Sequence, residues 1–196
     1  MSDFIILNAR IITLDEGDIP RRGEAMNTLG IIEHGFVLVQ DGTIQQVESG
    51  SPEESVFEKS DELVVIDAEG RVVLPTFVDC HTHSCWAGSR LDEFEAGLKG
   101  VPYLEILANG GGIMSTVRAV REASQEELAT SLVGRIALMA SLGTTVVEVK
   151  SGYGLTTKDE LKMLRAIHDA SQEIPQLVSG TFLGAHAIDP TVDNFT

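Results

Sequence analysis

The chain has 196 residues, and its 14 Lys and Arg against 30 Asp and Glu give a formal net charge of −16. This acidic balance argues against a nucleic-acid binder, which would show a basic face, and against adsorption to an anionic membrane. Hydrophobic residues make up 43% of the chain and charged residues 22%, so the composition is that of a folded protein with a core and excludes a disordered one.

The N-terminus and the cysteines indicate the compartment. The chain begins Met1-Ser2-Asp3 without a basic segment, so no signal peptide is expected. It has no run of about 18 apolar residues, so no transmembrane helix is expected either. Two cysteines, Cys80 and Cys85, are too few for a disulfide framework. A reduced, cytoplasmic protein is the default expectation.

Residues 1–70 are predicted to form a small all-β domain, because short runs of β-forming residues alternate with turn residues. Two of these runs meet at Asp41-Gly42, which is a strong signal for a β-hairpin. The predicted strands are 4–7, 10–14, 35–39, 43–47 and 63–66, and the acidic stretch 49–61 is a loop or short surface helix. A domain of this size has a marginal core, so we expect it to pack on another part of the protein.

Residues 71–196 alternate strand and helix patterns, which predicts parallel strands in an α/β sheet. Capping boxes are predicted at Ser124–Glu127 and at Thr157–Glu160, each opening a helix. The predicted strands are 77–81, 144–149 and 177–183, and a helical region spans 91–123 with an interruption at 110–112.

The sequence His81-Thr82-His83 stands at the carboxyl end of the first strand of this second part. Side chains alternate along a strand, so His81 and His83 point to the same face and can bind one metal ion. A metal held there would activate a water molecule for nucleophilic attack. The alternative is that the two histidines share a strand end without binding a metal.

The residues around this motif resemble a known family. The segment 75–83 resembles the first-strand signature of the amidohydrolase superfamily of metal-dependent hydrolases. Within that superfamily, the sequence is similar to the imidazolonepropionases of histidine breakdown, in order from about residue 75 to 190. The similar segments include 79–83, 87–91, 110–113, 115–119, 148–155, 160–165 and 182–187.

The resemblance implies a partial (β/α)₈ TIM barrel over 71–196, with 1–70 as a β-sandwich-type domain, and it implies site residues. His81 and His83 would be ligands of one zinc or iron ion, and Arg90, Tyr153 and His186 would contact 4-imidazolone-5-propanoate. Its ring would be hydrolysed to N-formimidoyl-L-glutamate. The implied partners are this small-molecule substrate and a second copy in a homodimer.

Each substrate residue also has a plainer interpretation. Arg90 suits bidentate capture of the propanoate carboxylate, but it could instead form a surface salt bridge with Asp92, Glu93 or Glu95. Tyr153 could serve packing, and His186 could be a hydrogen-bonded structural histidine. Tyr103 could line the pocket, but we expect it to pack in the core. For the other candidates we expect a structural role for Lys150, an unreactive thiol at Cys85, and surface or packing histidines at His34 and His168.

Length departs from the family pattern. A (β/α)₈ barrel takes about 250 residues, so 75–196 hold less than half of one. The resemblance implies that a further histidine and an aspartate on later strands complete the metal site, and the catalytic base is unassigned. We therefore expect this 196-residue chain to be inactive alone, with an open sheet.

Two other functions remain open on the sequence alone. A different amidohydrolase, such as a deaminase or another cyclic amidase, would keep His81 and His83 without needing Arg90 or Tyr153. A non-catalytic metal-binding or scaffold fragment would need neither substrate residue.

Overall fold

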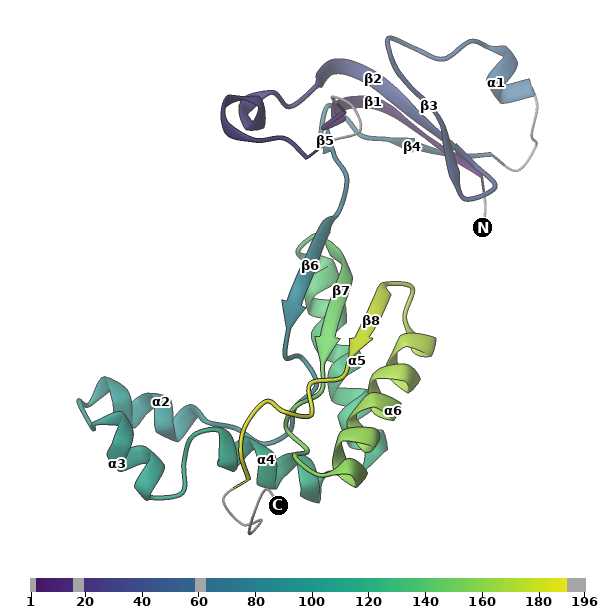
Figure 1. Ribbon diagram of the computed structural model, residues 1–196. Helices are drawn as coiled ribbons and strands as arrows, with labels where there is room; N and C mark the ends of the chain where they lie inside the picture. The colour runs from purple at the N-terminus through teal and green to yellow at the C-terminus, as the bar shows by residue number, and fades with distance from the viewer. Residues whose placement is uncertain (1–2, 16–19, 59–62, 190–196) are drawn as a thin grey trace. The chain divides into compact units, whose positions relative to one another are not determined.

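The computed structural model describes residues 3–15, 20–58 and 63–189 (Figure 1). The chain divides into two compact units, Met1–Pro75 and Thr76–Thr196. Each unit has its own sheet and its own core. None of the helices in the described ranges is long and apolar enough to cross a membrane.

The first unit is built on a sheet in the order β3-β2-β1-β4, with β5 also paired to β1. Strands β1 and β2 pair antiparallel, as do β2 and β3, whereas β4 and β5 run parallel to β1. The strands are β1 (Phe4–Ile12), β2 (Ile31–Gln40), β3 (Thr43–Ser49), β4 (Val64–Asp67) and β5 (Val72–Val73), with short helices η1 (Gly23–Asn27) and α1 (Ser55–Glu58).

Local sequence explains the turns of this sheet. The predicted hairpin forms between β2 and β3, where Asp41 (φ 50°) and Gly42 (φ 72°) both take the positive φ that a two-residue hairpin turn needs. The two predicted runs around Asn8 instead form one strand, β1. Asn8 has φ 53° and stands at a register shift against β2, so a bulge accommodates it without ending the strand.

Both faces of this sheet bury apolar side chains, because alternate residues of β2 point to opposite sides. Val37 and Val39 join one cluster with Ala9 and Ile11, while Phe36 and Leu38 join another with Ile5. The described strands of the unit form one sheet, and the sandwich-type domain stays a prediction.

The second unit is built on three parallel strands in the order β6-β7-β8. They are β6 (Phe77–Thr82), β7 (Thr144–Lys150) and β8 (Leu177–Thr181), joined through the 17-residue helices α5 (Gln125–Ser141) and α6 (Thr157–Glu173). Val147 and Val149 of β7 pack with buried residues of both helices into one core. All three predicted strands, and their parallel pairing, are confirmed.

The predicted helical region 91–123 is three separate helices: α2 (Leu91–Leu98), α3 (Tyr103–Ala108) and α4 (Ile113–Glu122). The break at 110–112 is confirmed, and a second break at 99–102 was not predicted. Gly100 takes φ 86° there, and Pro102 is the N-cap of α3, so both residues are signals that the sequence offered.

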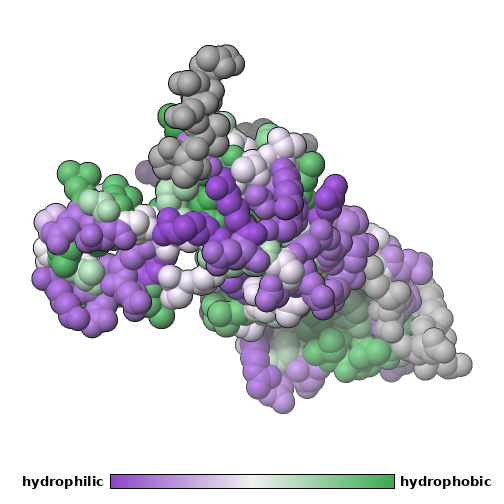
Figure 2. Space-filling view, turned by 90° about the horizontal axis from the view of Figure 1, so that it is seen from below, coloured by the Kyte–Doolittle hydropathy of each residue, from purple (hydrophilic) through white to green (hydrophobic). Residues whose placement is uncertain are grey.

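The pair α2 and α3 carries much exposed apolar surface. Leu91, Leu98 and Leu104 are each more than 70% exposed. Figure 2 shows these helices at its left, where apolar side chains lie among polar ones on the surface.

One predicted capping box is confirmed and the other is wrong. Ser124 and Glu127 bond reciprocally at the start of α5. At α6 the N-cap is Thr156, whose hydroxyl accepts from the N–H of Asp159. Glu160 bonds backbone N–H groups of the preceding loop, at Gly152, Gly154 and Leu155. The sequence did not separate the two adjacent threonines, because both can accept this bond.

The core of the second unit supports a stability prediction. Leu132 of α5 is fully buried among β7 and α6 residues, so Leu132→Ala is expected to lower the free energy of unfolding by about 2–5 kcal/mol in urea titrations. Leu138 of the same helix is 64% exposed. Leu138→Ala is therefore expected to change the free energy of unfolding by less than about 0.5 kcal/mol. Equal losses would show that α5 packs through a different face.

Candidate metal and substrate site

The predicted site residues of the second unit follow the carboxyl ends of its strands. His81 lies in β6 and His83 just after it, Tyr153 follows β7, and His186 follows β8. Because the strands are parallel, their carboxyl ends meet at one edge of the sheet, which brings residues from separate parts of the chain together.

Four of these side chains form a cluster around His83. The centroid of its ring lies 5.8 Å from that of His81, 5.5 Å from Tyr153 and 4.7 Å from His186. Tyr153 and His186 are themselves 5.6 Å apart, edge to face. The structure therefore brings the predicted metal ligands and two predicted substrate residues into one place.

His83 is the most constrained member of the cluster. Burial lowers its pKa, and the nearby His186, Lys150 and His81 lower it further, so the neutral ring is favoured. Its Nδ1 atom is buried and finds no hydrogen-bond partner in the described part of the chain. A buried nitrogen without a partner is costly unless a ligand completes it.

The two histidines fit a shared metal ion. When each of two rings bonds one ion at about 2.1 Å, their centroids lie roughly 5–6 Å apart, as those of His81 and His83 do. A neutral imidazole is the form that binds metals. Among residues 3–15, 20–58 and 63–189, no group of three or more His, Cys, Asp or Glu side chains is arranged to hold an ion.

A cavity of about 250 Å³ adjoins the cluster. Its lining includes His83, Tyr153, Arg90, Trp86 and Thr116. Burial raises the pKa of the Tyr153 phenol, and the charge of Arg90 acts against that rise. The tyrosine therefore stays protonated near neutral pH and offers a hydroxyl hydrogen, while Arg90 supplies a positive charge at the same cavity.

Arg90 forms one of the salt bridges that the sequence allowed and also lines the cavity. Its Nε lies 2.9 Å from a carboxylate oxygen of Glu93, which also accepts the N–H of Gly112 at 2.9 Å. The salt bridge thus holds the guanidinium in place, and the same side chain lines the cavity. The ion pair is half-exposed, so it orients Arg90 more than it stabilises the fold.

Glu148 and Lys150 belong to this region, and the sequence interpretation gave them no part in the site. Their side chains form an ion pair, and both influence the pKa of His83. Burial raises the pKa of Glu148, but bonds from Lys150, Thr181 and the Thr82 backbone outweigh it and the pKa is lowered. Strand alternation is the sequence signal that could have placed them in the site. Val147 and Val149 of β7 face the helices, so the residues between and after them, Glu148 and Lys150, face the other way.

Gly152 lets the two loops of the site approach each other. A Cβ at this position would lie 3.0 Å from the Cβ of His186 and 3.1 Å from the Leu183 carbonyl oxygen, and the residue has φ +112°. Only glycine fits this conformation and spacing without strain.

The remaining predicted candidates lie apart from the cluster. Tyr103 is 60% exposed on α3, so the expectation that it packs in the core is wrong. His34 on β2 and His168 on α6 are both exposed. None of the three joins the ring contacts around His83.

The two cysteines differ sharply in exposure, which predicts their reactivity. Cys80 is exposed, whereas burial raises the pKa of the Cys85 thiol to about 12. Since the thiolate is the nucleophile, iodoacetamide at pH 8 is expected to alkylate Cys80 and leave Cys85 unmodified in the folded protein. Mass spectrometry of the peptides checks this, with urea-unfolded protein as the control in which both react. Labelling of Cys85 in folded protein would contradict its burial.

Curated relatives share most of this sequence. An imidazolonepropionase of Symbiobacterium thermophilum is 47% identical over 192 residues, which is 96% of this chain and 44% of the relative. Imidazolonepropionases of Bacillus cytotoxicus (46% over 189 residues, 96% and 44%) and Alkaliphilus oremlandii (43% over 179 residues, 91% and 42%) match similarly. The chain is homologous to the imidazolonepropionases. It spans less than half of the length of these relatives, and no family model matches it.

Solved structures resemble the chain in fold. A 5-methylcytosine deaminase from Klebsiella pneumoniae aligns with a TM-score of 0.56 and 21% identity, over 91% of this chain and 35% of that one. An Arthobacter aurescens triazine hydrolase (TM-score 0.57, 16% identity, 93% and 36%) and a Pyrococcus furiosus metal-dependent hydrolase (0.56, 14%, 92% and 50%) are similar. The chain, a homologue of the imidazolonepropionases, therefore shares its mixed α/β fold with part of each of these enzymes.

Proposed function

We propose that the protein is an imidazolonepropionase, which hydrolyses the cyclic amide of 4-imidazolone-5-propanoate to N-formimidoyl-L-glutamate. The observation that carries the proposal is the cluster of His81, His83, Tyr153 and His186 beside a cavity lined by Arg90. In this arrangement Arg90 offers a positive charge to the propanoate carboxylate, and His81 and His83 offer a metal position next to the ring. The homologues are named imidazolonepropionase, which supports the proposed function.

His81 and His83 are the proposed ligands of one zinc or iron ion. When bound, the ion supplies Lewis-acid polarisation of the ring carbonyl and activation of water. The buried Nδ1 of His83 and the lowered pKa of its ring support this role. Two ligands do not fill a metal site, so further ligands belong to parts of the protein outside the described residues.

The other residues bind and orient the substrate in this proposal. Arg90, held by Glu93, captures the propanoate carboxylate through its planar guanidinium. The Tyr153 hydroxyl and the His186 ring, which contact each other and His83, hydrogen-bond the imidazolone. Fixing both ends of the substrate would hold its carbonyl next to His83, and such positioning contributes strongly to rate.

The fold is proposed to be the first part of a (β/α)₈ barrel over 71–196, preceded by a β-sandwich-type domain over 1–70. The three parallel strands and their helices support the barrel, as does the likeness to amidohydrolases. We propose a homodimer in the cytoplasm, with a small-molecule substrate and neither nucleic acid nor membrane as partner. The free thiols of Cys80 and Cys85 support a reduced compartment.

The test is turnover by the complete, metal-loaded protein. The absorbance of 4-imidazolone-5-propanoate is expected to fall, and mass spectrometry is expected to find a product heavier by one water. No ammonia is expected, because ring opening retains both ring nitrogens, whereas a deaminase would release it. Unchanged absorbance with metal-loaded protein would exclude the proposal and leave the two alternatives, an amidohydrolase with a different substrate and a non-catalytic protein.

A further inference from the structure

The loop 151–155 between β7 and α6 presents Tyr153 to the site. This loop has no regular secondary structure of its own. Gly152 and Leu155 both take positive φ, 112° and 54°. Something must hold such a loop in place, because glycine tolerates a positive φ but leucine does not favour one.

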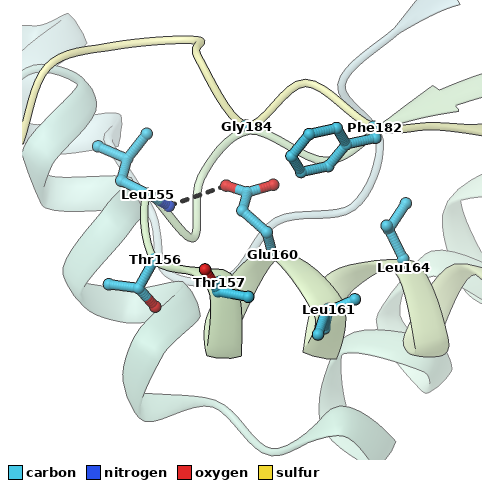
Figure 3. A pocket seen from close by; sticks show the side chains of 8 residues that line it. All are labelled: Leu155, Thr156, Thr157, Glu160, Leu161, Leu164, Phe182 and Gly184. Atoms are coloured by element: carbon cyan, nitrogen blue, oxygen red, sulfur yellow. Dashed lines mark hydrogen bonds between the residues drawn. The ribbon is translucent and has the colours of Figure 1, made fainter.

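The carboxylate of Glu160 holds the loop in place through hydrogen bonds. Glu160 lies in the first turn of α6 and is only 2% exposed. One of its oxygens accepts the N–H of Gly152, and the other accepts those of Gly154 and Leu155, each at 2.8 Å. Figure 3 shows the carboxylate rising from α6 toward the Leu155 nitrogen. The bonds bracket Tyr153 on both sides in the sequence.

The environment favours this arrangement over other roles for Glu160. A carboxylate at a helix N-terminus is stabilised by the helix dipole, and bonds to an ionised acceptor are among the stronger ones in proteins. The capping role at α6 is already filled by Thr156. The loop also approaches the helix closely, since a Cβ on Gly154 would lie 2.4 Å from the Glu160 nitrogen.

Glu160 does not itself touch the candidate substrate cavity. It lines a different cavity, of about 450 Å³, with Leu161, Leu164, Phe182 and other residues (Figure 3). The cavity next to His83 has Tyr153 in its lining and not Glu160. Any effect of Glu160 on that cavity therefore passes through the loop.

We propose that Glu160 is a positioning residue, whose carboxylate fixes the loop 151–155 so that the Tyr153 hydroxyl faces the substrate beside His83 and His186. This inference rests on the proposed function for what Tyr153 binds, but the hold on the loop can be measured without it. Glu160 acts through the backbone and takes no part in bond making.

The test compares Glu160→Gln with Glu127→Gln in the complete protein. Glutamine keeps the shape of the side chain but replaces one accepting oxygen by a donor, so the bonds to the loop are weakened. Glu127 is the matched control, because it too accepts a backbone N–H at a helix N-terminus, at Ser124, away from the site. If Glu160→Gln does not fold, Glu160→Asp is used, which keeps the charge but withdraws it from the loop.

Three measurements are made on each variant. Hydrogen exchange of the amides of Gly152, Gly154 and Leu155 is expected to be about tenfold faster in Glu160→Gln than in wild type. KM for 4-imidazolone-5-propanoate is expected to rise by about tenfold. Adding Glu160→Gln to Tyr153→Phe is expected to raise KM little further, because both changes act on the same contact. Glu127→Gln is expected to change none of these.

The outcomes separate the two proposals. Unchanged loop exchange in Glu160→Gln, or losses that multiply with those of Tyr153→Phe, would overturn the positioning role. If Glu127→Gln changed the loop equally, the effect would be general loosening, and the role would again be refuted. If wild-type protein did not turn over the substrate, the proposed function would fail, and the exchange measurement alone would decide whether Glu160 holds the loop.

Discussion

Replacing His81 or His83 by alanine is expected to remove the bound metal and to lower kcat/KM of the complete protein by about a thousandfold. His81 is exposed, so its loss creates no core cavity and the protein should still fold. His83 contributes the buried Nδ1 atom, so its loss should have the larger effect on metal affinity. Elemental analysis after gel filtration measures the metal, and a steady-state assay measures the activity.

The control for the histidines is His168→Ala. His168 is exposed on α6 within the same unit, and its removal is expected to leave metal content and activity at wild-type levels. Full metal content in both His81→Ala and His83→Ala would refute their assignment as ligands. Loss of metal in the His168 variant as well would point to non-specific binding.

Replacing Arg90 by alanine is expected to raise KM for 4-imidazolone-5-propanoate by about ten- to a hundredfold, with a smaller change in kcat. The reason is that Arg90 lines the cavity but is proposed to bind the carboxylate at the far end from the reacting carbonyl. Arg90→Lys is expected to recover only part of the loss, because lysine keeps the charge without the planar fork.

Arg165→Ala is the control for Arg90. Arg165 is exposed on α6 and is expected to leave KM unchanged, which separates a local contact from the general charge of the protein. A fall in kcat at unchanged KM in Arg90→Ala would contradict the carboxylate-binding role and favour an amidohydrolase with a different substrate.

Local signals predicted the parts of this fold that depend on neighbouring residues. The hairpin at Asp41-Gly42 and the capping box of Ser124 and Glu127 form as expected, because their bonds close within a few residues. Parallel pairing of β6, β7 and β8 followed from the apolar strands and intervening helices. The break between α2 and α3 was not predicted, although Gly100 and Pro102 are local signals for the end of one helix and the start of the next.

Residues whose role depends on distant partners were harder to predict. Glu160 stands at the spacing of a capping box with Thr157, yet its carboxylate turns to the loop of Gly152, which only the packed structure shows. Glu148 and Lys150 have the strand parity of a site-facing pair, but an alternating pattern does not say which groups lie close to His83. Convergence of the histidines and Tyr153 followed from parallel strand ends, while their spacing required the structure.

The most direct test of the central claim is a crystal structure of the complete protein with its metal and imidazole-4-propanoate, an unreactive analogue, with data collected at the metal absorption edge. The account predicts an anomalous peak about 2.1 Å from nitrogens of both His81 and His83. It also predicts the analogue carboxylate on Arg90 and its ring in contact with Tyr153 and His186. A metal bound away from both histidines, or an analogue whose carboxylate avoids Arg90, would contradict it.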